Sequence, residues 1–99
     1  MPPLSLPEPV EIEFDAAKRT RTLAERGLDF ADAAKLFAGR HTVAPDDRLD
    51  YGEARFISAG LLDGRLVVWV WTLRGQARRI ISMRYAHERE ASEWRRRLG

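Results

Sequence analysis

The chain has 99 residues, of which 44% are hydrophobic and 32% charged, with a net charge of +2 and no cysteine. These values predict one globular domain and exclude disulfides, thiolate metal sites and a wholly disordered chain. The longest apolar run, residues 66–73 interrupted by Thr72, is too short to cross a bilayer, and the N-terminus does not have the pattern of a signal peptide.

Positive charge is concentrated toward the C-terminus. Residues 74–99 contain eight arginines and three glutamates, whereas residues 1–73 contain nine Lys or Arg and twelve Asp or Glu. A local basic surface of this kind favours polyanions, although a solvated helix face explains the charge alone equally well.

The N-terminal residues predict an irregular segment and then a strand. Residues 1–8 contain three prolines, so we expect them to be extended or disordered, followed by a single domain over residues 9–99. Residues 10–14 alternate apolar and acidic side chains, which is typical of a strand with one buried face.

Two helices are predicted next, each between a capping aspartate and a glycine. Asp15 can cap the first, which ends at Gly27, and Asp29 can cap the second, which ends at Gly39. The second helix has an apolar stripe at helical spacing, formed by Phe30, Ala33, Ala34 and Phe37, that we expect to face the core.

The second half predicts a meander of strands and a final helix. After a candidate short strand at 41–44 and a polar loop, the predicted strands are 54–61, 65–73 and 77–84, and the helix is 87–98 with Ala91, Trp94 and Leu98 as its apolar seam. The 65–73 strand is apolar on both faces, which places it centrally. The predicted fold class is therefore α+β, a small antiparallel sheet flanked by helices in the order β-α-α-β-β-β-β-α.

The 77–84 strand carries three arginines. Regular alternation puts Arg78 and Arg84 on one face with Ile80 and Ser82, and Arg79 on the other face with Ile81 and Met83. A guanidinium is costly to bury without a partner, and its fork of donors binds phosphate bidentately. We therefore predict a phosphate site on this strand, most simply for RNA, toward which Arg55 of a neighbouring strand can converge.

Metal-independent RNA cleavage requires a base for the 2′-hydroxyl, cations around the phosphorane and an acid for the leaving oxygen. Glu53 is the best-placed base if it adjoins Arg55 on the sheet, and an exposed structural role is the alternative. Further candidates for proton transfer are Lys18, Tyr85, His87 and Glu88. Lys18 can instead contact phosphate or lie on a solvated helix face.

Two other groups have simpler interpretations. Asp46, Asp47 and Asp50 can together bind a hard cation, but their spacing matches no EF-hand, so we expect neither a metal nor another cofactor. Trp69 and Trp71 can stack on nucleic-acid bases, but their central strand predicts a place in the core.

Several short motifs are weak signals one by one, but their order and spacing together are specific for one protein family. They are Phe14-Asp15-Ala16-Ala17-Lys18, Gly27-Leu28-Asp29-Phe30, Tyr51-Gly52-Glu53-Ala54-Arg55-Phe56 and Arg79-Ile80-Ile81-Ser82-Met83-Arg84. With these motifs, the sequence from about residue 11 to residue 90 resembles the BrnT family of toxins from bacterial type II toxin–antitoxin modules.

The resemblance implies a RelE-like ribonuclease fold and a cytoplasmic toxin that cleaves RNA and blocks translation. It also implies a BrnA-like antitoxin that neutralises the toxin in a hetero-oligomer and binds operator DNA, and no membrane partner. Together with the residue patterns, it makes Glu53, Arg55, Arg79 and Arg84 the candidate catalytic residues. The candidate RNA-binding residues are Lys18, Arg26, Arg78 and His87.

The sequence departs from the family pattern in the first predicted helix. Family members usually have Asn near position 22 and a Lys-His pair before the glycine, where this chain has Thr22, Glu25 and Arg26. Arg26 can replace only the charge of that histidine. The alternative hypothesis is therefore a non-catalytic interaction module that binds an antitoxin or nucleic acid.

Overall fold

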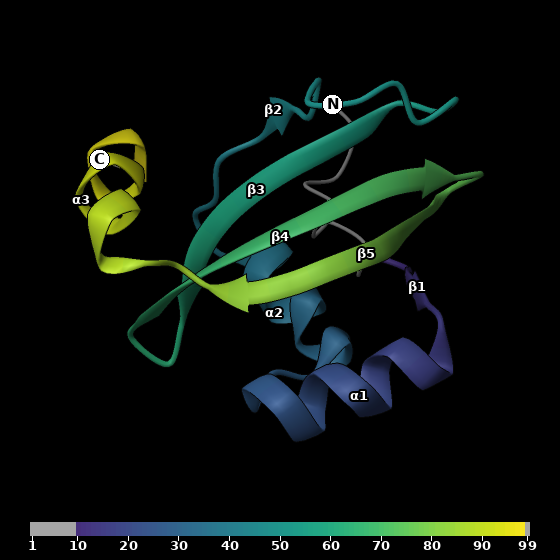
Figure 1. Cartoon of the computed structure of the whole chain (residues 1–99), viewed down its shortest axis with the longest axis horizontal. Coiled ribbons are helices and arrows are strands. Elements are labelled where there is room, and N and C mark those ends of the chain that lie inside the picture. Colours follow the sequence, from purple (N-terminus) through teal and green to yellow (C-terminus); the bar gives the residue numbers. More distant parts are fainter. Residues whose placement is uncertain (1–9, 99) are drawn as a thin grey trace, which may run out of the picture.

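The computed structural model describes residues 10–98 and has an α+β fold (Figure 1). Its elements are β1 (Ile12–Phe14), α1 (Ala16–Arg26), a 3₁₀ turn (Phe30–Asp32), α2 (Ala33–Ala38), β2 (Ala44–Pro45), β3 (Arg55–Leu62), β4 (Arg65–Arg74), β5 (Ala77–Tyr85) and α3 (Glu88–Leu98). The predicted class and element order are confirmed. The prediction for residues 1–8 lies outside the described residues. Within residues 10–98, no helix is long and apolar enough to cross a membrane.

The five strands form one sheet in the order β1-β5-β4-β3-β2. Strands β2 to β5 pair antiparallel, and β1 adds a parallel pair on the outer edge of β5, which makes the sheet mixed. Strand β4 is central, as its two-sided apolar pattern predicts, and its residues 66–72 are buried.

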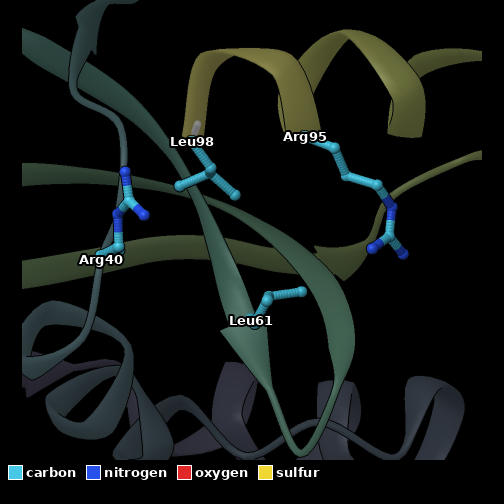
Figure 2. Close-up of a pocket in the computed structure, with 4 residues that line it drawn as sticks. All are labelled: Arg40, Leu61, Arg95 and Leu98. Carbon is cyan, nitrogen blue, oxygen red and sulfur yellow. The ribbon is translucent and has the colours of Figure 1, made fainter.

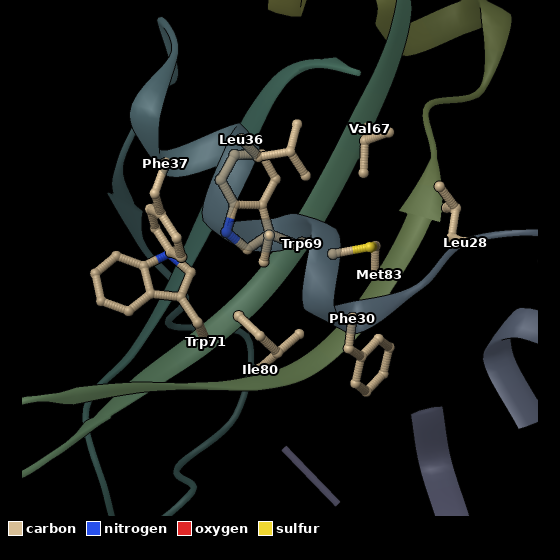
Figure 3. Close-up of a cluster of buried hydrophobic side chains, with 10 residues drawn as sticks. Leu28, Phe30, Leu36, Phe37, Val67, Trp69, Trp71, Ile80 and Met83 are labelled. Atoms are coloured by element: carbon tan, nitrogen blue, oxygen red, sulfur yellow. The ribbon is translucent and has the colours of Figure 1, made fainter. Parts of the chain in front are cut away.

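The main core lies between one face of the sheet, here called the core face, and the segment from Leu28 through α2. Phe37 contacts both Trp69 and Trp71 edge-on, with ring centroids 5.3 and 5.1 Å apart (Figure 3). The predicted core positions of both tryptophans are confirmed, as are those of Phe30, Ala33 and Phe37 in the apolar stripe. The prediction that Ala34 faces the core is wrong, because Ala34 is exposed.

The opposite side of the sheet, here called the second face, is covered at one end by α3 (Figure 1). The predicted seam of Ala91, Trp94 and Leu98 packs there around Ala59, Leu66 and Val68. Because α3 occupies this end, the other end of the second face lies beyond its packing contacts.

A β-bulge in β5 separates its arginines. Val70 pairs with Ser82 and Trp71 pairs with Ile80, so Ile81 is an extra residue on β5. One extra residue breaks the alternation of side chains along β5. Every later side chain of the strand then lies on the face opposite to the one that regular alternation predicts. The prediction that Arg78 shares a face with Arg84 is therefore wrong.

The corrected faces follow from the pairing. Arg78 lies on the core side, with its guanidinium 4.4 Å from the Phe37 ring centroid and 5.2 Å from that of Trp71. Arg79 and Arg84 share the second face, because their partners Thr72 and Val68 lie on the same side of β4.

Candidate functional site

The end of β5 forms a cationic hollow with the end of α1 and the start of α3. It has a volume of about 460 Å³ and is lined by Arg26, Arg84, Tyr85, Ala86 and His87. We call it the Arg84 hollow. Three candidate residues therefore meet on one concave surface, namely Arg84, His87 and the distant Arg26.

Arg84 is held in place by Glu90. The two side chains form a two-point ion pair, in which Nη1 donates to Oε1 and Nη2 donates to Oε2 at 3.2 Å. Glu90 Oε1 also accepts from the backbone N–H of His87 at 2.8 Å, which ties the first turn of α3 to β5. Arg84 is the largest cause that lowers the pKa of Glu90 to about 2, so Glu90 stays ionised at neutral pH.

Helix α1 covers the edge of β5 beyond its short pairing with β1. Its N-terminus is capped by Asp15, whose carboxylate accepts from the N–H of Lys18 at 2.9 Å. Lys18 Nζ donates to the Ile81 carbonyl at 3.4 Å, and Arg26 Nη1 donates to the Met83 carbonyl at 2.9 Å. Within the described chain neither cation forms an ion pair with a carboxylate, so both charges are available to an anion beside β5.

A second group of charges lies further along the second face. Arg55, Thr72 and Arg79 are direct cross-strand neighbours on β3, β4 and β5, and Glu13 of β1 continues the row. We call these four residues the Arg55–Arg79 row. Arg79 Nη1 and Glu13 Oε1 form an ion pair at 2.7 Å.

Glu53 lies just before β3 and adjoins Arg55, which is the condition under which it is the candidate base. Its carboxylate lies 3.6 Å from Arg55 Nε and 3.1 Å from Arg74 Nη2. The guanidinium of Arg55 also stacks on Tyr51, 4.1 Å from the ring centroid. Glu53 Oε2 and Arg55 Nε are both buried without a hydrogen-bond partner among the described residues, so their 3.6 Å ion pair is the contact that compensates both groups.

The four candidate catalytic residues do not meet at one point. Arg55 lies opposite Thr72 on β4, whereas Arg84 lies opposite Val68, four residues away. The two residues are separated by two strand spacings of about 4.8 Å and by four residues that each rise about 3.4 Å. Their backbones therefore lie about 17 Å apart. One phosphate cannot contact both Glu53 and Arg84, although one RNA strand can contact both groups.

Other residues singled out by sequence have structural contacts. The carboxylate of Asp46 is occupied by Arg48, which donates to both oxygens at 2.7 and 2.8 Å and lowers the pKa of Asp46. The guanidinium of Arg65 stacks on the Tyr85 ring, 3.6 Å from the ring centroid. A base can stack on Tyr85 only if Arg65 moves.

Sequence reasoning missed two carboxylates, Glu13 and Glu90, that pair with the site arginines. The spacing of His87 and Glu90 matches the reciprocal half of a helix capping box, in which a glutamate accepts from an N–H three residues earlier. That local signal indicates the contact with His87. The pairing of Glu90 with Arg84 depends on where the loop after β5 turns, which no local pattern gives.

Comparison with known proteins gives one family. A sequence model described as ribonuclease toxin, BrnT, of type II toxin-antitoxin system matches residues 14–90. The matched span contains every candidate site residue and Glu90, and it ends in the first turn of α3. No match to a curated protein was found.

Proposed function

Because this chain belongs to the BrnT family of type II toxin–antitoxin ribonuclease toxins, we propose that it is an endoribonuclease whose reaction takes place in the Arg84 hollow. The observation that carries this proposal is the convergence on one concave surface of Arg26 from the end of α1, Arg84 from β5 and His87 from the connection to α3. Concave sites with convergent polar groups are the usual places for binding and catalysis.

Arg84 and Arg26 supply the positive charge that the reaction needs. A guanidinium has five N–H donors, and Glu90 and the Tyr85 carbonyl engage only the Nη groups of Arg84. The remaining donors of Arg84 can bind a phosphate oxygen while Glu90 keeps the group oriented. Arg26, whose side chain donates to a backbone carbonyl and to no carboxylate among residues 10–98, adds a second cation at the wall of the hollow.

The proposed reaction is transesterification by the RNA itself. The 2′-oxygen attacks the adjacent phosphorus, the 5′-oxygen leaves, and the products are a 2′,3′-cyclic phosphate and a 5′-hydroxyl. The arginines stabilise the phosphorane, so the step requires no metal ion. The 2′-hydroxyl loses one proton and the leaving 5′-oxygen gains one. His87, whose side chain is exposed at the hollow, carries one of these two transfers, and water carries the other.

The Arg55–Arg79 row extends the RNA site in this proposal. Arg79 shares the second face with Arg84, so an RNA strand lying along β5 reaches both. A phosphate at the row competes with Glu13 for Arg79, which makes this part of the binding dependent on salt. Glu53 and Arg55 then orient a neighbouring nucleotide.

The biological setting follows from the family. A type II module pairs a toxin with a protein antitoxin, and the family match supports that partner for this chain. We infer a cytoplasmic toxin that blocks translation by cleaving RNA. We further infer a BrnA-like antitoxin that forms a hetero-oligomer with it and binds operator DNA.

One observation favours a non-catalytic interaction module as the alternative. Arg55, Arg79 and Arg84 each have a carboxylate partner within the chain, so their charges are already compensated. In that case the protein does not cleave RNA, and its basic surface docks an antitoxin or nucleic acid.

Incubation of the purified protein with RNA in EDTA separates the two functions. The ribonuclease proposal predicts 2′,3′-cyclic phosphate and 5′-hydroxyl ends, and a loss of rate of about 100-fold or more for His87→Ala. Arg89→Ala, an exposed change two residues later in the first turn of α3, serves as the matched control. Intact RNA after incubation with folded wild-type protein would contradict the proposal.

A further inference from the structure

A second hollow lies away from the Arg84 hollow, between the end of β3 and the last turns of α3. It has a volume of about 280 Å³ and is lined by Arg40, Leu61, Arg95 and Leu98. Figure 2 shows the side chains of Leu61 and Leu98 pointing into this space, with the two arginines on opposite sides of it. We call it the Leu61 groove.

The apolar floor results from where α3 ends. Leu61 pairs with Leu66 across β3 and β4, and α3 buries Leu66 but leaves the Leu61 residue 51% exposed. The loop after α2 forms the other wall because Gly60 allows it to approach. A Cβ at Gly60 would lie only 3.2 Å from the Arg40 carbonyl oxygen.

The groove differs from the RNA site in its apolar floor. Arg40 and Arg95 have no carboxylate partner within residues 10–98, which is also true of Arg26 in the Arg84 hollow, whereas Arg55, Arg79 and Arg84 each have one. Two uncompensated cations beside a leucine floor complement an amphipathic helix with an aliphatic anchor and flanking acidic residues. Single-stranded RNA fits less well, because stacking of bases requires aromatic rings rather than leucines.

We propose that the Leu61 groove binds an acidic amphipathic helix of the antitoxin. This inference rests on the proposed function, in which the chain is a toxin with a protein antitoxin. The groove adjoins the end of α3 and the Arg84 hollow adjoins its start, and an eleven-residue helix spans about 16 Å. An antitoxin helix can therefore occupy the groove without contacting Arg84.

The groove also lies partly outside the family match. The match ends at residue 90, before Arg95 and Leu98. A docking surface built from residues beyond the shared pattern allows a toxin to distinguish its own antitoxin from those of related modules.

The test measures the affinity of toxin variants for the purified product of the gene adjacent to the toxin gene by calorimetry. Arg95→Glu should weaken binding roughly tenfold or more, because it places a negative charge against acidic residues. Arg96→Glu makes the same charge change at the next position of α3 and should alter binding less than about threefold. Both variants should cleave RNA at the wild-type rate, since neither residue lies in the Arg84 hollow.

Equal effects of the two variants, or unchanged binding by Arg95→Glu, would overturn the inference. Loss of RNA affinity instead of antitoxin affinity in Arg95→Glu would also overturn it, because the groove would then be an RNA site. Leu61→Ser tests the apolar floor without changing charge and should weaken antitoxin binding as well. Failure of the proposed function gives a different result, since the wild-type protein would then leave RNA intact whatever the antitoxin affinity.

Discussion

Replacement of Glu90 by glutamine tests how α3 is attached to the sheet. The wild-type carboxylate pairs with Arg84 and accepts from the His87 N–H. Glutamine keeps an oxygen that can accept from His87 but removes the charge that balances Arg84. The variant therefore isolates the contribution of the ion pair to the free energy of unfolding.

The magnitude follows from the pKa of Glu90, which the fold lowers from 4.5 to about 2. Each pKa unit is worth about 1.4 kcal/mol, so the full difference corresponds to about 3 kcal/mol. The Glu90 side chain is 26% exposed and that of Arg84 is 34% exposed, so solvent screens the pair. We expect Glu90→Gln to lower the free energy of unfolding by about 1–2 kcal/mol at pH 7.

The sign of the pH dependence is fixed, because folding depresses this pKa. The ionised carboxylate stabilises the fold fully above pH 4.5, and the stabilisation is lost as the pH falls toward 2. The difference between wild type and Glu90→Gln should therefore shrink between pH 7 and pH 3.

Urea unfolding followed by tryptophan fluorescence at both pH values measures this difference. Glu93→Gln is the control, because the Glu93 side chain is 58% exposed and, within the described part of the chain, pairs with Arg97 of the same helix alone. A loss of stability that is the same at pH 7 and pH 3, or that Glu93→Gln reproduces, would refute the reasoning.

Three further changes test the fold and the strand faces. Ser58→Ala removes the acceptor of the Trp71 indole N–H, 3.0 Å away in the core, and should cost about 1–3 kcal/mol in urea unfolding. Gly60→Ala places a Cβ 3.2 Å from a backbone carbonyl and should cost about 1–3 kcal/mol by overpacking. Arg79→Ala should weaken RNA binding and reduce its salt dependence by about 0.7 in the log–log slope, whereas Arg78→Ala should change neither in a filter-binding titration.

The class, element order and core of this fold follow from its sequence. Trp69 and Trp71 lie on a strand that is apolar on both faces, and only a central strand buries such a pattern. The Phe30–Phe37 stripe has helical spacing and packs on them. These predictions succeed because periodicity over many residues determines which side is buried.

The site was less predictable because it depends on one residue. The bulge at Ile81 puts Arg79, rather than Arg78, on the face of Arg84. The sequence of residues 77–84 is compatible with a regular strand and with a bulged one. Regular alternation alone therefore assigns Arg78, instead of Arg79, to the face of Arg84. The family resemblance favoured Arg79 and Arg84 without a structural reason, and the bulge supplies one.

The central claim is that cleavage occurs in the Arg84 hollow, and the single-turnover rate of RNA cleavage at saturating protein tests it most directly. Arg84→Ala should lower that rate about 100-fold or more, because it removes the cation that faces the phosphorane. Arg55→Ala should mainly raise the protein concentration needed for half saturation. Wild-type cleavage by Arg84→Ala, or a loss of the saturated rate confined to Arg55→Ala, would contradict the claim.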